Sequence, residues 1–214
     1  MERYFLFNDK NTYCDWNLIL TAKDITPPEP KTNYIELDGM SGSLDLSDAL
    51  TGEITYKDRN ISATFWTDYG TRKDRERIIR ELTAFLHGKK VKIIEPDDSD
   101  HYFSGRAVVK SVTNSLAYAE ISIECTCEPW RYCHEETIRE ILGNSQAVIN
   151  NNGVKTLTPI FSVVGSVEIV YNGERFALND GRYQIPDVKL HQGVNVIGVT
   201  GDGVVKVSYR EAEL

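Results

Sequence analysis

The stretch that decides the fold runs from residue 34 to residue 66 and reads YIELDGMSGSLDLSDALTGEITYKDRNISATFW. Residues 34–37 have the composition of a strand, and the Gly/Ser-rich segment 39–43 is typical of a turn. Apolar and polar residues then alternate over 61–65, which is the period of a half-buried strand. The stretch contains no nucleophile–base pair, so we interpret it as architecture rather than as an active site.

Residues 1–135 are predicted to form an N-terminal α+β domain that is mainly β, with one amphipathic helix. In TRKDRERIIRELTAFLHGKK, apolar residues recur with a 3.6-residue period, which predicts a helix over about 73–87 lying on a sheet. Opening strands are expected at 4–7 and 16–22. The segment 116–127 alternates regularly and predicts a long strand. The face expected to share one environment comprises Ala117, Ala119, Ile121, Ile123, Cys125 and Cys127.

Residues 136–214 are predicted to form a small all-β sandwich, because short strand-like runs follow one another with Gly-rich turns between them. Asn172-Gly173 and Asp202-Gly203 carry the two strongest hairpin signals, since these residue types accept a positive φ. The expected strands are 146–150, 158–163, 166–171, 174–178, 182–185, 194–199 and 204–209.

Composition narrows the class of protein. The 214 residues are 41% hydrophobic, and 32 acidic against 24 basic residues give a net charge of −8. No run approaches the roughly 18 apolar residues of a membrane-spanning helix, and the N-terminus MERYFLFNDKNTYCDW predicts no secretory signal. An acidic chain disfavours a grip on nucleic acid, which needs clustered Lys and Arg. It is compatible with a surface that DNA slides past without sticking.

Candidate chemical sites have stronger structural interpretations. Cys125-x-Cys127 on a strand is poorly spaced for zinc, which prefers C-x₂₋₄-C, and reduced, buried thiols are expected. Asp97, Asp98 and Asp100 lack the pattern of a calcium loop and predict a solvated hairpin turn. The histidines stand in no catalytic motif. We therefore expect no catalytic residue, no cofactor, no metal and no enzymatic activity.

Four segments carry a resemblance to a known family. The signature stretch 34–66, the helix ending in LHGKKVKII and the strand AEISIECTCEPWRY look like the distal tail protein family of phages with long, non-contractile tails and of prophages. The segment from PIFSVVGSVEIVYNGERFAL to the C-terminus is similar to the family's C-terminal sandwich. Together these segments cover nearly the whole chain.

The resemblance implies a ring of six copies formed by the N-terminal domain, with a galectin-like or carbohydrate-module-like sandwich outside. Such a ring sits in the virion tail tip, after synthesis in the cytoplasm of the bacterial host, and DNA passes through its channel without specific binding. Implied partners are the tail tube protein, the tape-measure protein and the tail-associated tip protein. Contacts with a neighbouring copy or the channel are expected first at Gly39, Ser41, Gly42, Asp45 and Asp48.

Two alternatives remain open. The chain could be a carbohydrate-binding adhesin that recognises host cell-wall glycans, with Tyr171, Phe176 and Tyr183 as exposed aromatic candidates. It could instead be a wall hydrolase that uses carboxylates within 36–48, because glycoside hydrolysis needs two carboxylates ~5–10 Å apart. The structural ring subunit is the favoured hypothesis, because nearby carboxylates in turns usually act as turn acceptors.

Overall fold

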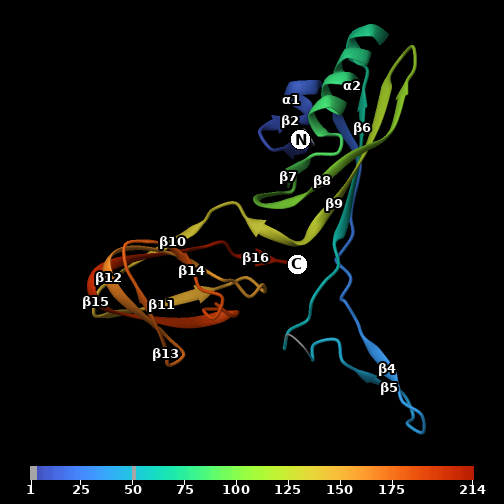
Figure 1. Ribbon diagram of the computed structural model, residues 1–214. Helices are drawn as coiled ribbons and strands as arrows, with labels where there is room; N and C mark the ends of the chain where they lie inside the picture. Colours follow the sequence, from blue (N-terminus) through green and yellow to red (C-terminus); the bar gives the residue numbers. More distant parts are fainter. Residues whose placement is uncertain (1–3, 50–51) are drawn as a thin grey trace. The chain divides into compact units, whose positions relative to one another are not determined.

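The computed structural model describes residues 4–49 and 52–214 (Figure 1). The chain divides into two compact units, residues 1–131 together with Leu214, and residues 132–213. The chain is mainly β, in agreement with the fold class predicted from the sequence. Each unit is described separately below.

The first unit is built on one sheet with the strand order β2-β1-β7-β8-β9-β6-β3. A separate two-stranded ladder, β4 with β5, stands outside that sheet (Figure 1). The elements are β1 (Leu6–Phe7), β2 (Lys10–Asn11), α1 (Thr12–Trp16), β3 (Ile19–Ile25), β4 (Tyr34–Glu36), β5 (Ser43–Asp45), β6 (Arg59–Thr67), α2 (Arg72–Leu86), β7 (Lys90–Glu95), β8 (Asp98–Asn114) and β9 (Ala119–Cys133).

Helix α2 matches the predicted amphipathic helix to within one residue at each end. A capping box starts it: the Asp74 N–H donates to the Thr71 hydroxyl (3.3 Å), and the Thr71 N–H donates to the Asp74 carboxylate (2.9 Å). Its apolar stripe, which includes Ile78, Leu82 and Leu86, is buried in the core of the unit. The periodic pattern and the cap therefore specify the same element.

The core of the first unit follows the predicted alternation. In the β6–β9 ladder Ile61 pairs with Cys125, and Phe65 pairs with Ile121. All four side chains are buried. The inward face expected for the 116–127 segment is confirmed from Ala119 onward, while residues 115–118 form the connection between β8 and β9.

Helix α1 was not predicted, and the strand expected from residue 16 begins at Ile19. The Asn11 side chain accepts from the N–H groups of Tyr13 and Cys14, and Asn17 closes the helix in a left-handed conformation with φ of 53°. At five residues the helix is too short to show a 3.6-residue period. The two asparagines that cap it, Asn11 and Asn17, are the sequence signal that could have predicted this helix.

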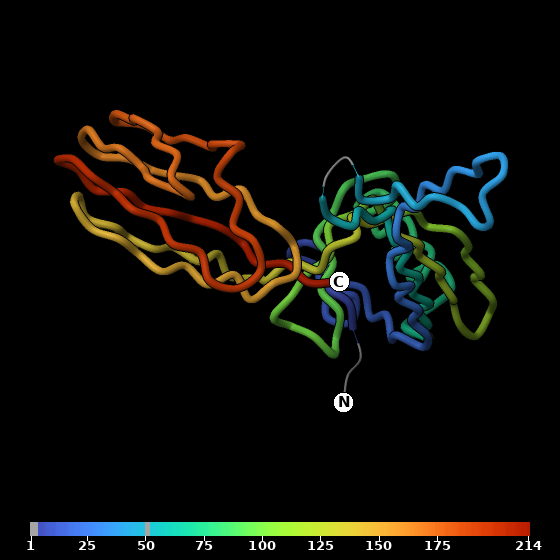
Figure 2. Tube along the Cα trace, turned by 90° about the horizontal axis from the view of Figure 1, so that it is seen from below, coloured from blue at the N-terminus to red at the C-terminus, as the bar shows by residue number. Residues whose placement is uncertain are grey.

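The second unit is organised by two long strands that pair with each other from Ile160↔Ser208 to Val170↔Gly198. Strands β14 and β10 flank one half of this pair, and β13 and β11 flank the other half (Figure 2). The two halves enclose a common apolar core in a sandwich-like arrangement. The elements are β10 (Thr137–Leu142), β11 (Ser145–Asn151), β12 (Ile160–Tyr171), β13 (Glu174–Leu178), β14 (Gly181–Gln184), β15 (Gly193–Tyr209) and β16 (Ala212–Glu213).

One predicted hairpin of this unit is confirmed and the other is wrong. Asn172 and Gly173 have φ of 50° and 87° and connect β12 to β13, as a two-residue hairpin turn requires. Asp202-Gly203 lies inside β15 and pairs with Gly165 and Ser166 of β12. The glycines that suggested a turn instead let both strands continue through a corner, so 158–171 and 194–209 contain one strand each where two were expected.

Candidate interaction surface

The segment between β3 and β6 forms an extended arm that ends in the β4–β5 hairpin. Its base is tied by a bridge between Pro30 and Tyr56, where the Lys31 N–H donates to the Thr55 carbonyl (2.8 Å). The Leu46 N–H donates to the Asn33 carbonyl (2.8 Å) above it. The arm, defined here as residues 29–54, is therefore held by main-chain hydrogen bonds.

The arm has no core of its own. Every described side chain of β4 and β5 is exposed, and so are several large apolar side chains. An isolated two-stranded hairpin is marginally stable in water, and a cluster of exposed apolar side chains marks an interaction surface. The exposed fractions are Tyr34 58%, Ile35 41%, Leu37 49%, Met40 47%, Leu44 41% and Ile54 59%.

All five residues predicted as contact sites lie on this arm. Gly39 and Gly42 have φ of 85° and 86° and, with Ser41, form the turn between β4 and β5. Asp45 ends β5, and the Asp48 carbonyl accepts from the Gly52 N–H (2.7 Å) in the following turn. The structure thus places four of the five residues on the β4–β5 hairpin and Asp48 in the turn that follows it, and their contact with a neighbour stays a prediction.

The sequence analysis missed the apolar surface of this arm. The Leu44 side chain, for example, is 41% exposed. The signal that could have revealed it is the position of Tyr34 and Ile35 between a Pro-rich segment and a Gly/Ser-rich turn. Flanking segments of that composition leave few residues to bury an apolar hairpin.

Asp45 of the arm does not have the environment of a general acid. The Ser47 hydroxyl and N–H both donate to Asp45, and these hydrogen bonds lower the pKa of that carboxyl. A glycosidase acid needs its pKa raised by burial or by a neighbouring carboxylate. Asp45 is thus a turn acceptor, which argues against its use as the acid of the hydrolase alternative.

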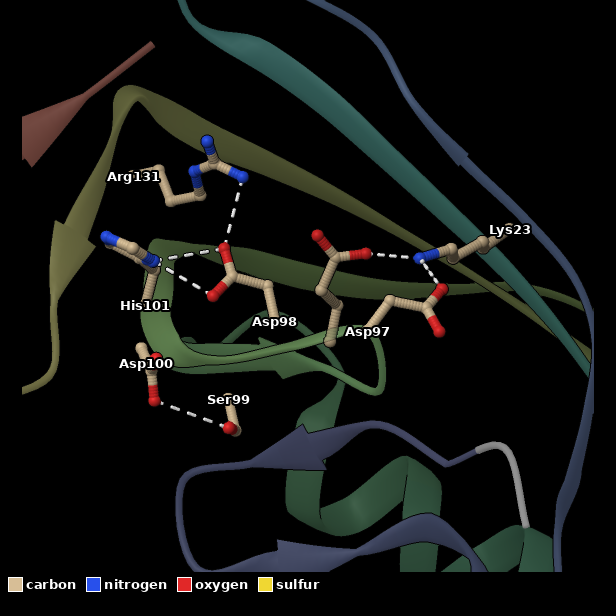
Figure 3. Close-up of polar contacts among 8 residues, drawn as sticks. Lys23, Asp97, Asp98, Ser99, Asp100, His101 and Arg131 are labelled. Atoms are coloured by element: carbon tan, nitrogen blue, oxygen red, sulfur yellow. Dashed lines mark hydrogen bonds and ion pairs between the residues drawn. The ribbon is translucent and has the colours of Figure 1, made fainter. Parts of the chain in front are cut away.

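The acidic turn between β7 and β8 differs in part from the solvated turn predicted there (Figure 3). Asp97 is exposed and accepts from Lys23 Nζ (2.7 Å). Asp98 is half-buried between Nδ1 of His101 (2.9 Å) and Nη1 of Arg131 (3.1 Å). Burial disfavours its ionised form, but His101 and Arg131 outweigh that cost and lower the pKa of Asp98. These carboxylates thus bind the protein's own cations.

Cys125 and Cys127 have the environment of buried, protonated thiols. Cys125 and Cys127 are free and buried, and burial raises the pKa of both thiols, that of Cys127 to about 12. Within residues 4–49 and 52–214 there is no group of three or more His, Cys, Asp or Glu side chains that could hold a metal ion. Neither helix of that range is long and apolar enough to cross a membrane.

The aromatic residues that motivated the adhesin alternative are not exposed, so that prediction is wrong. Tyr171 is buried, and its hydroxyl donates to the Asn195 side chain (3.1 Å). Phe176 and Tyr183 are half-buried and pack against the core of the second unit. Alternation placed these side chains on a strand but could not assign their face.

Comparison with known proteins adds one informative match. No family model and no curated protein matches the chain. Among solved structures, the SPP1 Dit protein (gp 19.1), described as a paradigm of the hub adsorption apparatus in phages that infect Gram-positive bacteria, superimposes with a TM-score of 0.73. The match covers 97% of this chain and 98% of SPP1 Dit at 12% identity.

This chain has the fold of SPP1 Dit. The match spans both units, so the order of a helix-bearing β unit followed by a sandwich-like unit is common to the two chains. At 12% identity the likeness concerns the backbone, and individual contact residues must be argued from this chain's own surface.

Proposed function

We propose that this chain is a structural subunit of a phage tail tip, and that several copies form a closed ring between the tail tube and the adsorption apparatus. The observation that carries the proposal is the full-length match to SPP1 Dit, a hub protein. In this reading the chain acts by assembly rather than by catalysis. We expect a cyclic homo-oligomer, with six copies as the expected number.

The exposed arm supports assembly. Its apolar side chains, led by Tyr34 and Ile54, keep exposed fractions of 41% to 59% in the part of the chain that the structure describes. Packing against a second copy would remove them from water, which stabilises by roughly 25 cal/mol per Å² of apolar surface. A head-to-tail contact of this kind generates a ring when its rotation closes.

Charge gives this contact a direction. The arm holds six acidic residues and one lysine, a net charge of −5. The exposed side of α2 carries Arg72, Lys73, Arg77 and Arg80 together with Glu76 and Glu81, so four basic and two acidic residues give it a net charge of +2. Opposite potentials favour association between the arm of one copy and α2 of the next.

The remaining partners follow from the proposed place in the virion. A ring at the tail tip would contact the tail tube protein, the tape-measure protein and the tail-associated tip protein. DNA would cross its channel during ejection, and a net charge of −8 would keep the channel from retaining it.

The oligomeric state of the purified full-length chain tests the proposal. Light scattering coupled to size-exclusion chromatography is expected to give a mass of about six chains, and negative-stain images are expected to show rings. A chain that stays strictly monomeric at high concentration, with no rings in the images, would overturn the proposal. The double variant Tyr34→Ser/Ile54→Ser is expected to shift the mass toward the monomer without loss of circular dichroism signal.

A further inference from the structure

Strand β11 (Ser145–Asn151) is an open edge of the sheet in the second unit (Figure 1). Among the described residues it pairs with β15 along its full length, from Ser145↔Val199 to Asn151↔Gly193, and with no other strand. An edge strand presents a row of backbone N–H and C=O groups that can pair with another chain. We propose that β11 pairs with β11 of a second copy of this chain, antiparallel and about a two-fold axis at Val148.

This edge lacks the features by which folded proteins protect their sheet edges, which are charges, prolines, bulges and very short strands. β11 is seven residues long and its register with β15 has no shift. Neither the segment 141–154 nor the facing segment 193–199 contains a charged residue or a proline. The other three edges of the unit carry charges, at Arg139 and Glu140 of β10, Glu174 and Arg175 of β13, and Arg182 of β14. Of these four edges, β11 is therefore the one suited to an added strand.

The sequence of β11 is complementary to itself in the proposed register. With Val148 on the axis, Gln146 of each copy faces Asn150 of the other. The Asn150 amide nitrogen donates to the Asn152 side chain (2.6 Å), which leaves the Asn150 amide oxygen to accept from Gln146. No pair of like charges meets along the contact, because no residue of the strand is charged. These matches favour a second copy as the occupant of the edge.

The exposed face of the edge adds an apolar contact. Val148 pairs with Val196 across β11 and β15, and their exposed fractions are 66% and 46%. Two copies joined at Val148 would place four valines side by side, with Val148 of both copies at the centre and Val196 of each copy outside. Cross-strand pairs of β-branched side chains stabilise a sheet, so this row supports the same register as the amide pairs.

The structure holds β11 in place before any partner binds. The buried Asn151 side chain donates to the carbonyls of Lys155 (3.0 Å) and Leu190 (3.1 Å). The Tyr209 hydroxyl donates to the Asn150 carbonyl (3.1 Å), and a carbonyl oxygen has a second lone pair for a further hydrogen bond. A strand that is already ordered loses little conformational freedom on pairing.

This contact differs from the one that would build the proposed ring. The arm and α2 lie in the first unit and would meet head to tail, whereas β11 lies in the second unit and would meet its own equivalent. The inference therefore goes beyond the proposed function, and its test uses a background in which the arm contact is weakened. That background is the full chain with Tyr34→Ser/Ile54→Ser, and with Cys14→Ser to remove an exposed thiol.

Disulfide formation on a non-reducing gel measures the pairing. Opposite Cα atoms of an antiparallel pair lie roughly 4.5–5.5 Å apart, within the range that a disulfide spans. Val148→Cys is therefore expected to form a covalent dimer at least about tenfold faster than Val194→Cys. Val194 is the matched control because it is 72% exposed, but its two copies would lie three strand spacings apart, at least about 14 Å. Equal rates for the two variants would overturn the proposal.

A mixture of Gln146→Cys and Asn150→Cys tests the orientation of the two strands. In the antiparallel register the two introduced thiols face each other, so the mixture is expected to cross-link. Each variant alone is expected to cross-link poorly, because equal positions lie four residues apart along the strand, roughly 14 Å. Cross-linking of each variant with itself and not in the mixture would indicate a parallel pair and contradict the proposal.

A charge placed on the axis tests whether Val148 lies in the contact. Val148→Lys, added to both variants of the mixture, brings two like charges together and is expected to lower the cross-linked yield at least about tenfold. Val164→Lys, at a 68% exposed position of β12, adds the same charge elsewhere and is the matched control that should leave the yield unchanged. Circular dichroism confirms the fold of each variant. A yield that Val148→Lys does not lower would place the contact elsewhere and overturn the proposal.

Discussion

Two buried arginines of the first unit have opposite hydrogen-bonding environments. The Arg75 side chain, 1% exposed, donates from Nη1 to the Gly70 carbonyl (3.0 Å) and from Nη2 to the carbonyls of Ser115 (3.1 Å) and Leu116 (2.9 Å). It thereby ties the start of α2 to the connection between β8 and β9. The Leu116 side chain is 87% exposed, and its backbone is held at that connection by the hydrogen bond from Arg75 to its carbonyl.

Replacement of Arg75 by methionine is expected to destabilise the first unit by about 3 kcal/mol, because three carbonyls lose a charged donor. Urea unfolding followed by tryptophan fluorescence measures this, since all three tryptophans lie in the first unit. Arg75→Lys is the control: it keeps the charge but lacks the planar fork and should fall between. A loss below about 1 kcal/mol for Arg75→Met would contradict the proposed tie.

Arg59 gives the opposite expectation. Its side chain is buried 5.2 Å from the Phe103 ring centre, and Nε and Nη2 have no hydrogen-bond partner among the described residues. Desolvation, followed by the charge of Arg131, lowers the pKa of Arg59. Because a buried, weakly paired charge is often replaced by an apolar side chain at no cost, Arg59→Met is expected to leave stability unchanged or raise it by up to about 2 kcal/mol. The same urea unfolding experiment measures this change. A clear loss of stability would contradict the expectation and show that the Arg59 guanidinium makes stabilising interactions in the folded chain.

At the scale of the element, the corner of the second unit requires glycine, because its backbone conformation and its close packing leave no room for a side chain. Gly201 has φ of 105°, and a Cβ there would lie 2.6 Å from the Ser166 carbonyl oxygen. Gly201→Ala is therefore expected to cost about 2 kcal/mol or more, from backbone strain alone. Gly198→Ala, in the same strand without either constraint, is expected to cost nothing. Thermal unfolding by circular dichroism compares the two, and equal melting temperatures would refute the distinction.

The same corner shows where prediction from sequence succeeds and where it stops. Periodicity located α2 and the buried faces of β6 and β9, because a repeating apolar pattern has one period for helix and another for strand. Local turn chemistry identified Asn172-Gly173 but could not tell a hairpin at Asp202-Gly203 from a strand that bends, since glycine permits both. The difference is made by Gly165, on the facing strand, which is distant in sequence.

The position of the candidate site in the chain was predictable from the sequence, but the exposure of its apolar side chains was not. The turn residues Gly39 and Gly42 were read from composition, and they do lie at the tip of one hairpin. That the hairpin stands apart from the sheet, with Tyr34 exposed, depends on which strands pair, and pairing is a property of the whole unit.

At the scale of the whole molecule, the proposed ring pairs the acidic arm of one copy with the net-basic side of α2 on the next. Both lie in the first unit, so each copy would offer one donor arm and one acceptor helix. A contact of this kind is heterologous, and it generates a ring when the rotation from one copy to the next closes. Ring formation should therefore weaken as salt rises, because exposed charges are screened beyond a Debye length of about 8 Å at physiological ionic strength.

Charge reversal on each side separately, and then on both, tests this complementarity. Asp38→Lys/Asp48→Lys on the arm and Arg77→Glu/Arg80→Glu on α2 each place like charges in contact, so each double variant is expected to lower the mass measured by light scattering. The four-fold variant carries the same pairs with their signs exchanged and is expected to recover the ring, since attraction depends on the product of the charges. Circular dichroism controls for folding in every case. Recovery in the four-fold variant cannot arise from damage to either element alone, whereas a four-fold variant that stays dissociated, or double variants that still assemble, would place the subunit contact elsewhere on the chain.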